Sequence, residues 1–187
     1  NNNQNILKKY HYFHSMTTDD LDKSIEEYQD FPKKGILFRD IFPLLTNPEL
    51  FSKVIESMAD SKVFRDAEAI LAIDARGFIF GTAIGLKLSK PILVARKPGK
   101  LPGELITKSY SLEYGTNSLS IQKELLNKYK KFAIVDDLLA TGGTVKCVKD
   151  ILIESGKEIS GLSVVIELKN LNARSSFTFP VDAQIYY

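Results

Sequence analysis

Two short, almost entirely apolar runs, each ending in aspartate, constrain the fold of this chain more than any other feature. "AILAID" covers residues 69–74 and "FAIVDD" covers residues 132–137. After each run come a polar or glycine-containing turn, a helical pattern and another apolar run, "PILVAR" in the first case and "LSVVIEL" in the second. An apolar run without polar alternation is typical of a strand buried on both faces. The repeated unit therefore predicts an α/β fold, with a parallel sheet core and helices on both faces.

The N-terminal quarter of the chain is less regular. Residues 1–16 are polar and rich in asparagine, so we expect a disordered tail there. A metal or catalytic role for its two histidines, His11 and His14, is possible but less favoured than an unstructured extension. "TTDDLDKSIEEY" has the spacing of an amphipathic helix, "DFPKKGILFRDIFPLL" is broken by Pro and Gly and predicts a loop or short hairpin, and "NPELFSKVIESMADSKV" predicts another helix. With 187 residues, the chain has room for a single domain over residues 17–187.

Composition and charge exclude several classes of protein. The net charge of +2, from 25 basic and 23 acidic residues, is too close to neutral for a general nucleic-acid binder. Cys147 is the only cysteine, which excludes an internal disulfide framework and fits a reducing compartment. No apolar run approaches the ~20 residues of a membrane helix, and the N-terminus lacks the apolar centre of a signal peptide. We therefore expect a cytoplasmic protein with no membrane partner.

The turn "ATGGT" after the second apolar run has the chemistry of a phosphate site. Gly142 and Gly143 allow the backbone to turn tightly and to approach a ligand closely. The helix that follows offers unpaired N–H groups, and Thr141 and Thr144 add hydroxyls. The turn lacks the Gly-Lys-Ser/Thr ending of a Walker loop and the Gly-x-Gly-x-x-Gly pattern of a dinucleotide site.

Charged side chains accompany both turns. Asp136 and Asp137 precede the phosphate turn, and ionised carboxylates suit the two hydroxyls of a ribose. Arg76, in "DARG", offers a fork that can bind phosphate through two hydrogen bonds. Ligands of such sheets bind at the carboxyl ends of the strands, where both turns fall. We interpret the segment between the two units, "KPGKLPGELITKSYSLEYG", as a mobile loop.

The glycines of "GFIFGTAIG" recur every four residues, as they do in dimers of membrane helices. Lys87 follows closely, however, and no 20-residue apolar span surrounds them. Close packing of this helix on the sheet is the better interpretation.

These motifs resemble a known family. "VDDLLATGGT" is similar to the 5-phosphoribosyl-1-pyrophosphate (PRPP) motif of the type I phosphoribosyltransferases. "DFPKKGILFRDIFPLL", "DARGFIFG", "RKPGKLPGE" and "SYSLEYG" resemble segments of the adenine-specific branch, in the same order and at similar spacings. The resemblance covers about residues 25–168 and implies the type I phosphoribosyltransferase fold with a small N-terminal hood, formed mainly by residues 17–47.

The resemblance implies a role for each group of site residues. The 5′-phosphate is held by the backbone of the phosphate loop, which we define as Ala140, Thr141, Gly142, Gly143 and Thr144, and the ribose by Asp136 and Asp137. Pyrophosphate is bound by a loop in which the family often has a cis peptide, Asp74, Ala75, Arg76 and Gly77, and by Arg96, Lys97 and Lys100. Many members have serine at the position of Ala75, so one hydroxyl contact is lost here.

The base and the catalytic loop are assigned in the same way. Adenine is bound by Leu37, Phe38, Arg39 and Leu168. The flexible loop carries Tyr110, Tyr114 and Glu113. Glu113 is the catalytic residue that handles the purine proton, and Arg76 the one that neutralises the leaving group. The related hypoxanthine and guanine enzymes are similar to one another in having a further acid where this chain has Ala140.

The resemblance implies purine salvage, in which adenine and PRPP give AMP and pyrophosphate in a homodimer. Mg²⁺ is carried by PRPP, with no direct protein ligand. Two alternatives remain open. Transcriptional regulators that resemble this fold keep the PRPP motif, but they normally add a DNA-binding domain, and we find no helix-turn-helix unit here. The second alternative is a phosphoribosyltransferase for xanthine or another base.

Glu113 yields the first testable prediction. Glu113→Gln keeps the side-chain shape but cannot exchange a proton, so turnover should fall by at least about a hundredfold. Steady-state kinetics and calorimetric titration with PRPP measure the two effects separately, and PRPP affinity should stay unchanged. Loss of PRPP binding would make Glu113 a structural part of its loop, and near-normal turnover would remove it from the chemistry.

Overall fold

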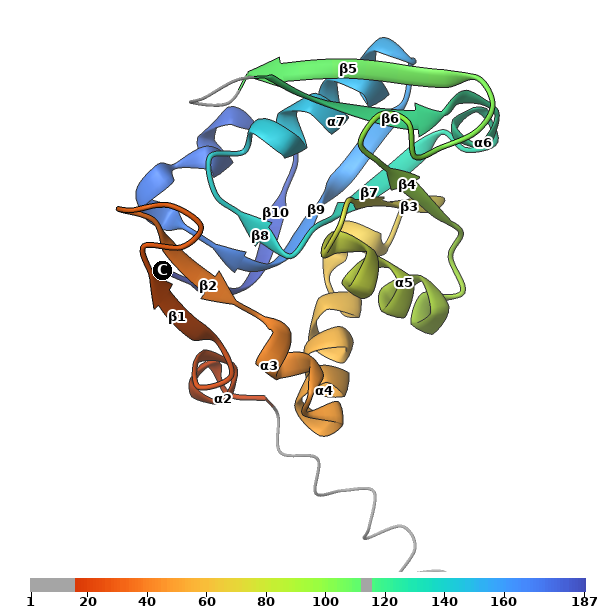
Figure 1. The fold of residues 1–187 in the computed structure, drawn as a ribbon. Helices are drawn as coiled ribbons and strands as arrows, with labels where there is room; N and C mark the ends of the chain where they lie inside the picture. The colour runs from red at the N-terminus through yellow and green to blue at the C-terminus, as the bar shows by residue number, and fades with distance from the viewer. Residues whose placement is uncertain (1–15, 112–115) are drawn as a thin grey trace, which may run out of the picture. The chain divides into compact units, whose positions relative to one another are not determined.

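The computed structural model of the chain describes residues 16–111 and 116–187 (Figure 1). The predicted tail, residues 1–16, lies outside the described residues except for Met16, and so do Glu113 and Tyr114. The chain divides into two compact units, the first ending at Val54 and the second running from Ile55 to Tyr187. The division falls within helix α4 (Pro48–Ala59). The presence of α4 confirms the second predicted helix.

The first unit contains two short helices, a hairpin and the beginning of a longer helix. Its elements are α2 (Thr18–Asp22), β1 (Glu26–Gln29), β2 (Leu37–Asp40), α3 (Phe42–Leu45) and the beginning of α4. The capping box of Thr17 and Asp20 begins α2, with N–H to oxygen distances of 3.1 Å in both directions. β1 and β2 form an antiparallel hairpin with Tyr28 opposite Phe38. The segment predicted as a loop or short hairpin, residues 30–45, supplies its turn and its second strand, while the first strand precedes that segment.

The first predicted helix was too long. Leu21 and Ile25 are buried as their spacing indicated, but α2 ends at Asp22 and Tyr28 lies on β1, where 48% of it is exposed. The backbone of residues 26–29 pairs with β2 instead of continuing the helix. Pairing with the next strand of the hairpin thus overrides the helical spacing.

The second unit is built on the predicted parallel sheet (Figure 1). Its main strands run in the order β10-β9-β7-β3-β4, all pairs being parallel, and β8 adds to β9. The sheet strands are β3 (Ala69–Ile73), β4 (Ile92–Ala95), β7 (Lys131–Val135), β8 (Leu138–Leu139), β9 (Glu158–Glu167) and β10 (Val181–Tyr186). The helical elements are η1 (Lys62–Phe64), α5 (Gly77–Leu88), α6 (Lys123–Asn127), α7 (Gly143–Glu154), η2 (Lys169–Leu171) and η3 (Ala173–Ser176). Both predicted strand–turn–helix–strand units are therefore confirmed.

Helices cover both faces of this sheet. Leu71 of β3 belongs to a buried apolar cluster with Val148 and Ile151 of α7. Ala72, the next residue, points to the opposite face, where it meets Gly81 of α5. Successive side chains of a strand point to opposite faces, so a fully apolar β3 is what two covered faces require.

The glycine spacing of α5 serves packing on the sheet, as predicted. A Cβ on Gly81 would lie 2.6 Å from the Cβ of Ala72, and one on Gly85 would lie 2.4 Å from the Ile92 side chain.

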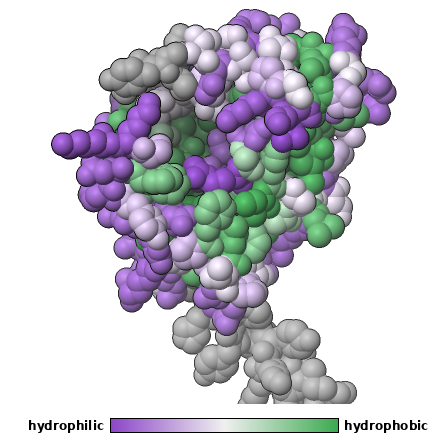
Figure 2. All heavy atoms as spheres, viewed as in Figure 1, coloured by the Kyte–Doolittle hydropathy of each residue, from purple (hydrophilic) through white to green (hydrophobic). Residues whose placement is uncertain are grey.

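No helix within the described residues is long and apolar enough to cross a membrane. On the face drawn in Figure 2, hydrophilic and apolar residues are interspersed.

The segment predicted as a mobile loop, residues 97–115, is not irregular throughout. β5 (Leu105–Ser111) and β6 (Thr116–Gln122) form an antiparallel pair, while residues 98–104 contain only turns and bends. Ile106 and Tyr110 alternate with more polar residues and pack against the apolar cluster. That period-two pattern was hidden by the polar and hydroxyl residues between them.

Gly81 provides a test of the packing. Gly81→Ala should destabilise the protein by about 1–3 kcal/mol, because overpacking against Ala72 outweighs the better helix propensity of alanine. Thermal unfolding measures the effect, and the exposed Thr82→Ala on the same helix is the matched control, expected within about 0.5 kcal/mol of the parent. The double variant Gly81→Ala/Ala72→Gly should recover part of the loss; equal stability of Gly81→Ala and the parent would contradict the packing argument.

Candidate functional site

The carboxyl ends of β3 and β7 meet at one edge of the sheet, beside a cavity of about 240 Å³. Most of its lining comes from the turns after these strands and from the beginning of α7. The lining residues are Asp74, Arg76, Lys97, Tyr110, Leu119, Asp136, Leu138, Leu139, Ala140, Thr141, Gly142, Gly143, Thr144 and Val145. The structure thus brings the predicted phosphate loop, one predicted ribose acid and Arg76 around a single cavity.

The phosphate loop leads directly into α7. Gly142 has φ +83°, a left-handed conformation that favours glycine, and a Cβ there would lie 3.1 Å from the Cβ of Ala173. The first N–H groups of a helix have no partner within it, and the dipole makes this end partly positive. The beginning of α7 therefore presents a site for an anion at the cavity.

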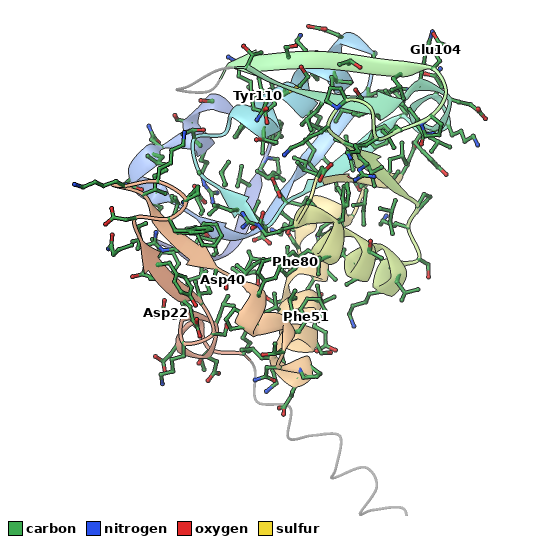
Figure 3. All side chains as sticks on the ribbon, in the orientation of Figure 1. Asp22, Asp40, Phe51, Phe80, Glu104 and Tyr110 are labelled. Carbon is green, nitrogen blue, oxygen red and sulfur yellow. The ribbon has the colours of Figure 1, made fainter. Side chains whose placement is uncertain are left out.

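Tyr110 reaches this loop from β5 (Figure 3). The Thr144 hydroxyl donates a hydrogen bond to the Tyr110 hydroxyl at 3.4 Å. A Cβ on Gly143 would lie 3.5 Å from the Tyr110 ring. Tyr110, predicted only as a residue of the flexible loop, is thus a wall of the cavity.

The acidic pair is buried and differs in its partners. Asp137 faces Arg76, with Nε 2.7 Å from Oδ2, and only 8% of the Asp137 side chain is exposed. Asp136 accepts a hydrogen bond from the Asp137 backbone N–H at 2.8 Å. Gly77 makes room for the Asp136 side chain, since a Cβ on Gly77 would lie 3.1 Å from Asp136 Oδ1.

Burial, together with the charge of Asp137, raises the pKa of the Asp136 carboxyl well above its ordinary value. The charge of Arg76 acts in the opposite direction but does not compensate. The fold therefore holds at its sheet edge a carboxyl whose ionised form lacks the solvation that water would provide.

A second set of contacts centres on Asp74. Its carboxylate accepts from Arg96 Nε at 3.3 Å and from the Lys97 backbone N–H at 3.4 Å, which ties the end of β4 to the end of β3. The Arg96 guanidinium also lies over the Phe78 ring, 5.6 Å from its centre. The peptide bond between Asp74 and Ala75 is cis, as the family resemblance implied.

Comparison with known proteins agrees with this geometry. The phosphoribosyl transferase domain family matches residues 44–185. An adenine phosphoribosyltransferase from Prochlorococcus marinus (strain MIT 9211) is 59% identical over 92% of this chain and 100% of its own length.

The chain belongs to the adenine phosphoribosyltransferase family.

Solved structures of the family show the same fold. The adenine phosphoribosyltransferase of Thermoanaerobacter pseudethanolicus has a TM-score of 0.86 and 38% identity, covering 91% of this chain and 100% of that one. The Saccharomyces cerevisiae enzyme, solved with adenine and an imino-altritol bisphosphate, has a TM-score of 0.81 and 31% identity, covering 90% of this chain and 98% of that one.

Several other predicted site residues do not line this cavity. Lys100 is exposed on the irregular segment after β4, and Arg96 is engaged by Asp74. Leu37, Phe38 and Arg39 lie together on β2 of the first unit, where Arg39 pairs with Glu27 at 3.0 Å. Leu168 follows β9 and its N–H donates to the Leu139 carbonyl at 2.9 Å.

Sequence reasoning missed the apolar part of the lining. Leu119, Leu138, Leu139 and Val145 contact the cavity although each reads in the sequence as an ordinary core residue. Only the pairing of β8 with β9 reveals that Leu138 and Leu139 form a strand beside the site. No local signal could have separated them from the core.

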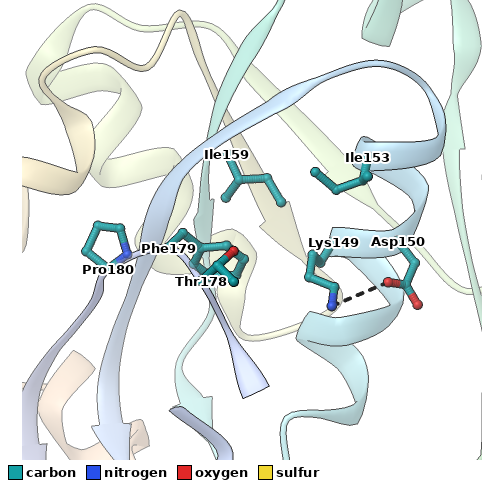
Figure 4. Close-up of a pocket in the computed structure, with 7 residues that line it drawn as sticks. All are labelled: Lys149, Asp150, Ile153, Ile159, Thr178, Phe179 and Pro180. Carbon is teal, nitrogen blue, oxygen red and sulfur yellow. Dashed lines mark ion pairs between the residues drawn. The ribbon is translucent and has the colours of Figure 1, made fainter. Parts of the chain in front are cut away.

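A second cavity, of about 550 Å³, lies elsewhere in the second unit (Figure 4). It is lined by Lys149, Asp150, Ile153, Ile159, Thr178, Phe179 and Pro180. Ile159 is near the beginning of β9 and Pro180 directly precedes β10, so this cavity is at the amino ends of the strands. Parallel sheets bind ligands at the opposite ends, and none of the predicted site residues lines it.

Asp136 gives the next prediction. Asp136→Asn should raise the melting temperature at pH 7.5, because it removes a buried charge while keeping an oxygen for the Asp137 N–H. A raised native pKa means that the parent loses stability as pH rises above about 3.9, the ordinary pKa of aspartate, so the advantage of the variant should disappear near pH 4.

Asp137→Asn is the matched control, since it removes the charge that faces Arg76 and should lower the melting temperature at pH 7.5. Thermal unfolding between pH 4 and 8 tests both variants. A lower melting temperature for Asp136→Asn across that range would contradict the burial argument.

Proposed function

We propose that the protein is a purine-salvage enzyme that transfers the 5-phosphoribosyl group of PRPP to adenine, giving AMP and pyrophosphate. The observation that carries this proposal is the cavity at the strand ends, where the phosphate loop, a buried acid and Arg76 converge. An anion site beside carboxylates suits a ligand that has phosphate and sugar hydroxyls on one small frame. The family to which the chain belongs supports the same reaction.

The proposed site residues imply one orientation for PRPP. Its 5′-phosphate meets the N–H groups at the beginning of α7 and the hydroxyls of Thr141 and Thr144. The ribose hydroxyls donate to Asp136 and Asp137 in their ionised forms. The pyrophosphate then lies toward residues 74–77, beside Arg76 and within reach of Lys97, which lines the same cavity.

We expect Mg²⁺ to arrive with PRPP rather than to be held by the protein alone. Among the described residues, no group of three His, Cys, Asp or Glu side chains could hold a metal on its own. Mg²⁺ usually keeps several waters and binds substrate phosphates with only one or two carboxylates. The ion would neutralise charge on the leaving pyrophosphate.

The chain's own residues position and stabilise the transferred group. As the bond from C1 of the ribose to pyrophosphate breaks, N9 of adenine forms the new bond and gives up its proton. Arg76 and Lys97 offset the negative charge that gathers on pyrophosphate. Glu113 receives the purine proton, and closure of its loop excludes water that would hydrolyse PRPP.

Adenine binding involves the hood and the residue after β9. Phe38 meets the edge of the Phe31 ring, with the ring centres 5.1 Å apart, and offers an apolar surface for a base. Leu37, Arg39 and Leu168 complete the proposed set. The enzyme would act in the cytoplasm as a homodimer, in which Lys100 and the loop before β5 serve pyrophosphate.

Specificity for another base, such as xanthine, is the second candidate, because the cavity described here recognises the phosphoribosyl group rather than the purine. A regulator that binds PRPP without catalysis is disfavoured by the "SYSLEYG" segment, which a binding protein would not need.

A turnover assay tests the proposal. With PRPP and Mg²⁺, adenine should be converted to AMP much faster than hypoxanthine, guanine or xanthine, as measured by chromatography of the products. Preference for another base would overturn the adenine assignment, and PRPP binding without turnover of any base would favour the regulator.

The ribose assignment has its own test. Asp136→Asn together with Asp137→Asn should weaken PRPP binding at least about tenfold, the effect of losing one charge-assisted hydrogen bond. Calorimetric titration with PRPP and Mg²⁺ measures it. The exposed pair Asp60→Asn/Asp66→Asn is the matched control and should bind as the parent does. Unchanged affinity in the folded double variant would contradict the assignment.

A further inference from the structure

An ion pair between a buried acid and an arginine whose side chain is 42% exposed lies next to the phosphate loop, outside the cavity lining. Glu167 is the last residue of β9 and only 3% exposed, and its carboxylate accepts two hydrogen bonds from Arg174 of η3, one of them from Nε at 3.0 Å. Arg174 Nη1 also donates to the Val181 carbonyl at 2.5 Å. One guanidinium therefore fastens the end of β9, the turn η3 and the beginning of β10 to one another.

The Glu167 end of this pair is continuous with the site. Glu167 is paired with Leu139 of β8, and the next residue, Leu168, donates its N–H to the Leu139 carbonyl at 2.9 Å. Leu139 immediately precedes Ala140, the first residue of the phosphate loop. The position of Glu167 thus fixes where the loop begins.

The Arg174 end supports the other side of the loop. Ala173 is 4% exposed and sits so close to Gly142 that a Cβ on Gly142 would be 3.1 Å from it. Phe177, whose N–H donates to the Arg174 carbonyl at 3.1 Å, would be 3.3 Å from the same Cβ. Segments on both sides of Arg174 therefore pack against Gly142.

We propose that the Arg174–Glu167 pair positions the phosphate loop, and thereby sets the affinity of the enzyme for the 5′-phosphate of its substrate. The pair touches neither substrate nor cavity, so Arg174 and Glu167 are positioning residues. This inference rests on the proposed function. N–H groups bind phosphate well only when all of them point to the same place, and the pair holds both ends of the segment that carries them.

Simple stabilisation is the competing explanation, and it makes a different prediction. The pair is weak evidence for stability, because desolvation of the buried Glu167 carboxylate offsets much of the attraction and solvent screens the partly exposed Arg174. Replacing both partners by uncharged residues of similar size often leaves stability unchanged. The fork of Arg174, with three hydrogen bonds in fixed directions, is suited to holding geometry.

The test is the double variant Arg174→Met/Glu167→Gln, which leaves no unpaired buried charge. It should fold and melt within a few degrees of the parent. Its affinity for ribose 5-phosphate, measured by calorimetry, should fall about tenfold or more, and the KM for PRPP should rise accordingly. Its affinity for pyrophosphate, which binds at residues 74–77, should stay unchanged.

Two further variants sharpen the experiment. Lys130→Met/Glu158→Gln removes an ion pair of 3.0 Å at the amino ends of β7 and β9 and should leave both affinities unchanged. Arg174→Lys keeps the charge but not the fork, so it should recover only part of the ribose 5-phosphate affinity. If the double variant does not fold, Arg174→Lys carries the same comparison of the two ligands.

Each outcome is decisive. Parental affinity for ribose 5-phosphate in the folded double variant would overturn the inference, and so would an equal loss of affinity for both ligands. Failure of the parent enzyme to convert adenine and PRPP would overturn the proposed function instead. Binding of ribose 5-phosphate by the parent is measured without turnover, so the two failures remain distinguishable.

Discussion

The parallel pairing of β3 with β7 is the constraint on which the site depends. Ala72 lies opposite Val135, so the turns that follow the two strands leave the sheet side by side. Arg76 from the first turn then reaches Asp137 of the second at 2.7 Å. A shift of this register by one residue would turn the buried side chains of β3 to the opposite face and separate the charged groups.

Close packing is what allows this juxtaposition. α5 begins at Gly77, which lies against the backbone of Val135 and Asp136, and a side chain at that position would push the two turns apart. Gly81 and Gly85 keep the rest of the helix near the sheet. The glycines thus serve the site indirectly, by bringing the beginning of one helix to the end of a neighbouring strand.

The site also destabilises the free protein. Asp136 is buried beside another carboxylate, and its raised pKa measures how poorly the fold solvates its charge. The ribose hydroxyls of the proposed substrate would supply the missing hydrogen bonds. A binding site that is stabilised by its ligand and strained without it is a common consequence of selection for function.

The sequence by itself determined the two strand–turn–helix–strand units, the parallel sheet, the phosphate loop and its neighbouring acids, because these depend on local apolar runs and on glycine positions. It failed where pairing with the neighbouring strand of a hairpin decided the structure. Residues 26–29 left a helical pattern to pair with β2, and residues 105–111 became a strand through β6. Only the tertiary structure placed Tyr110 beside Gly143 and joined Arg174 to Glu167, because no periodic pattern in the sequence indicates either contact.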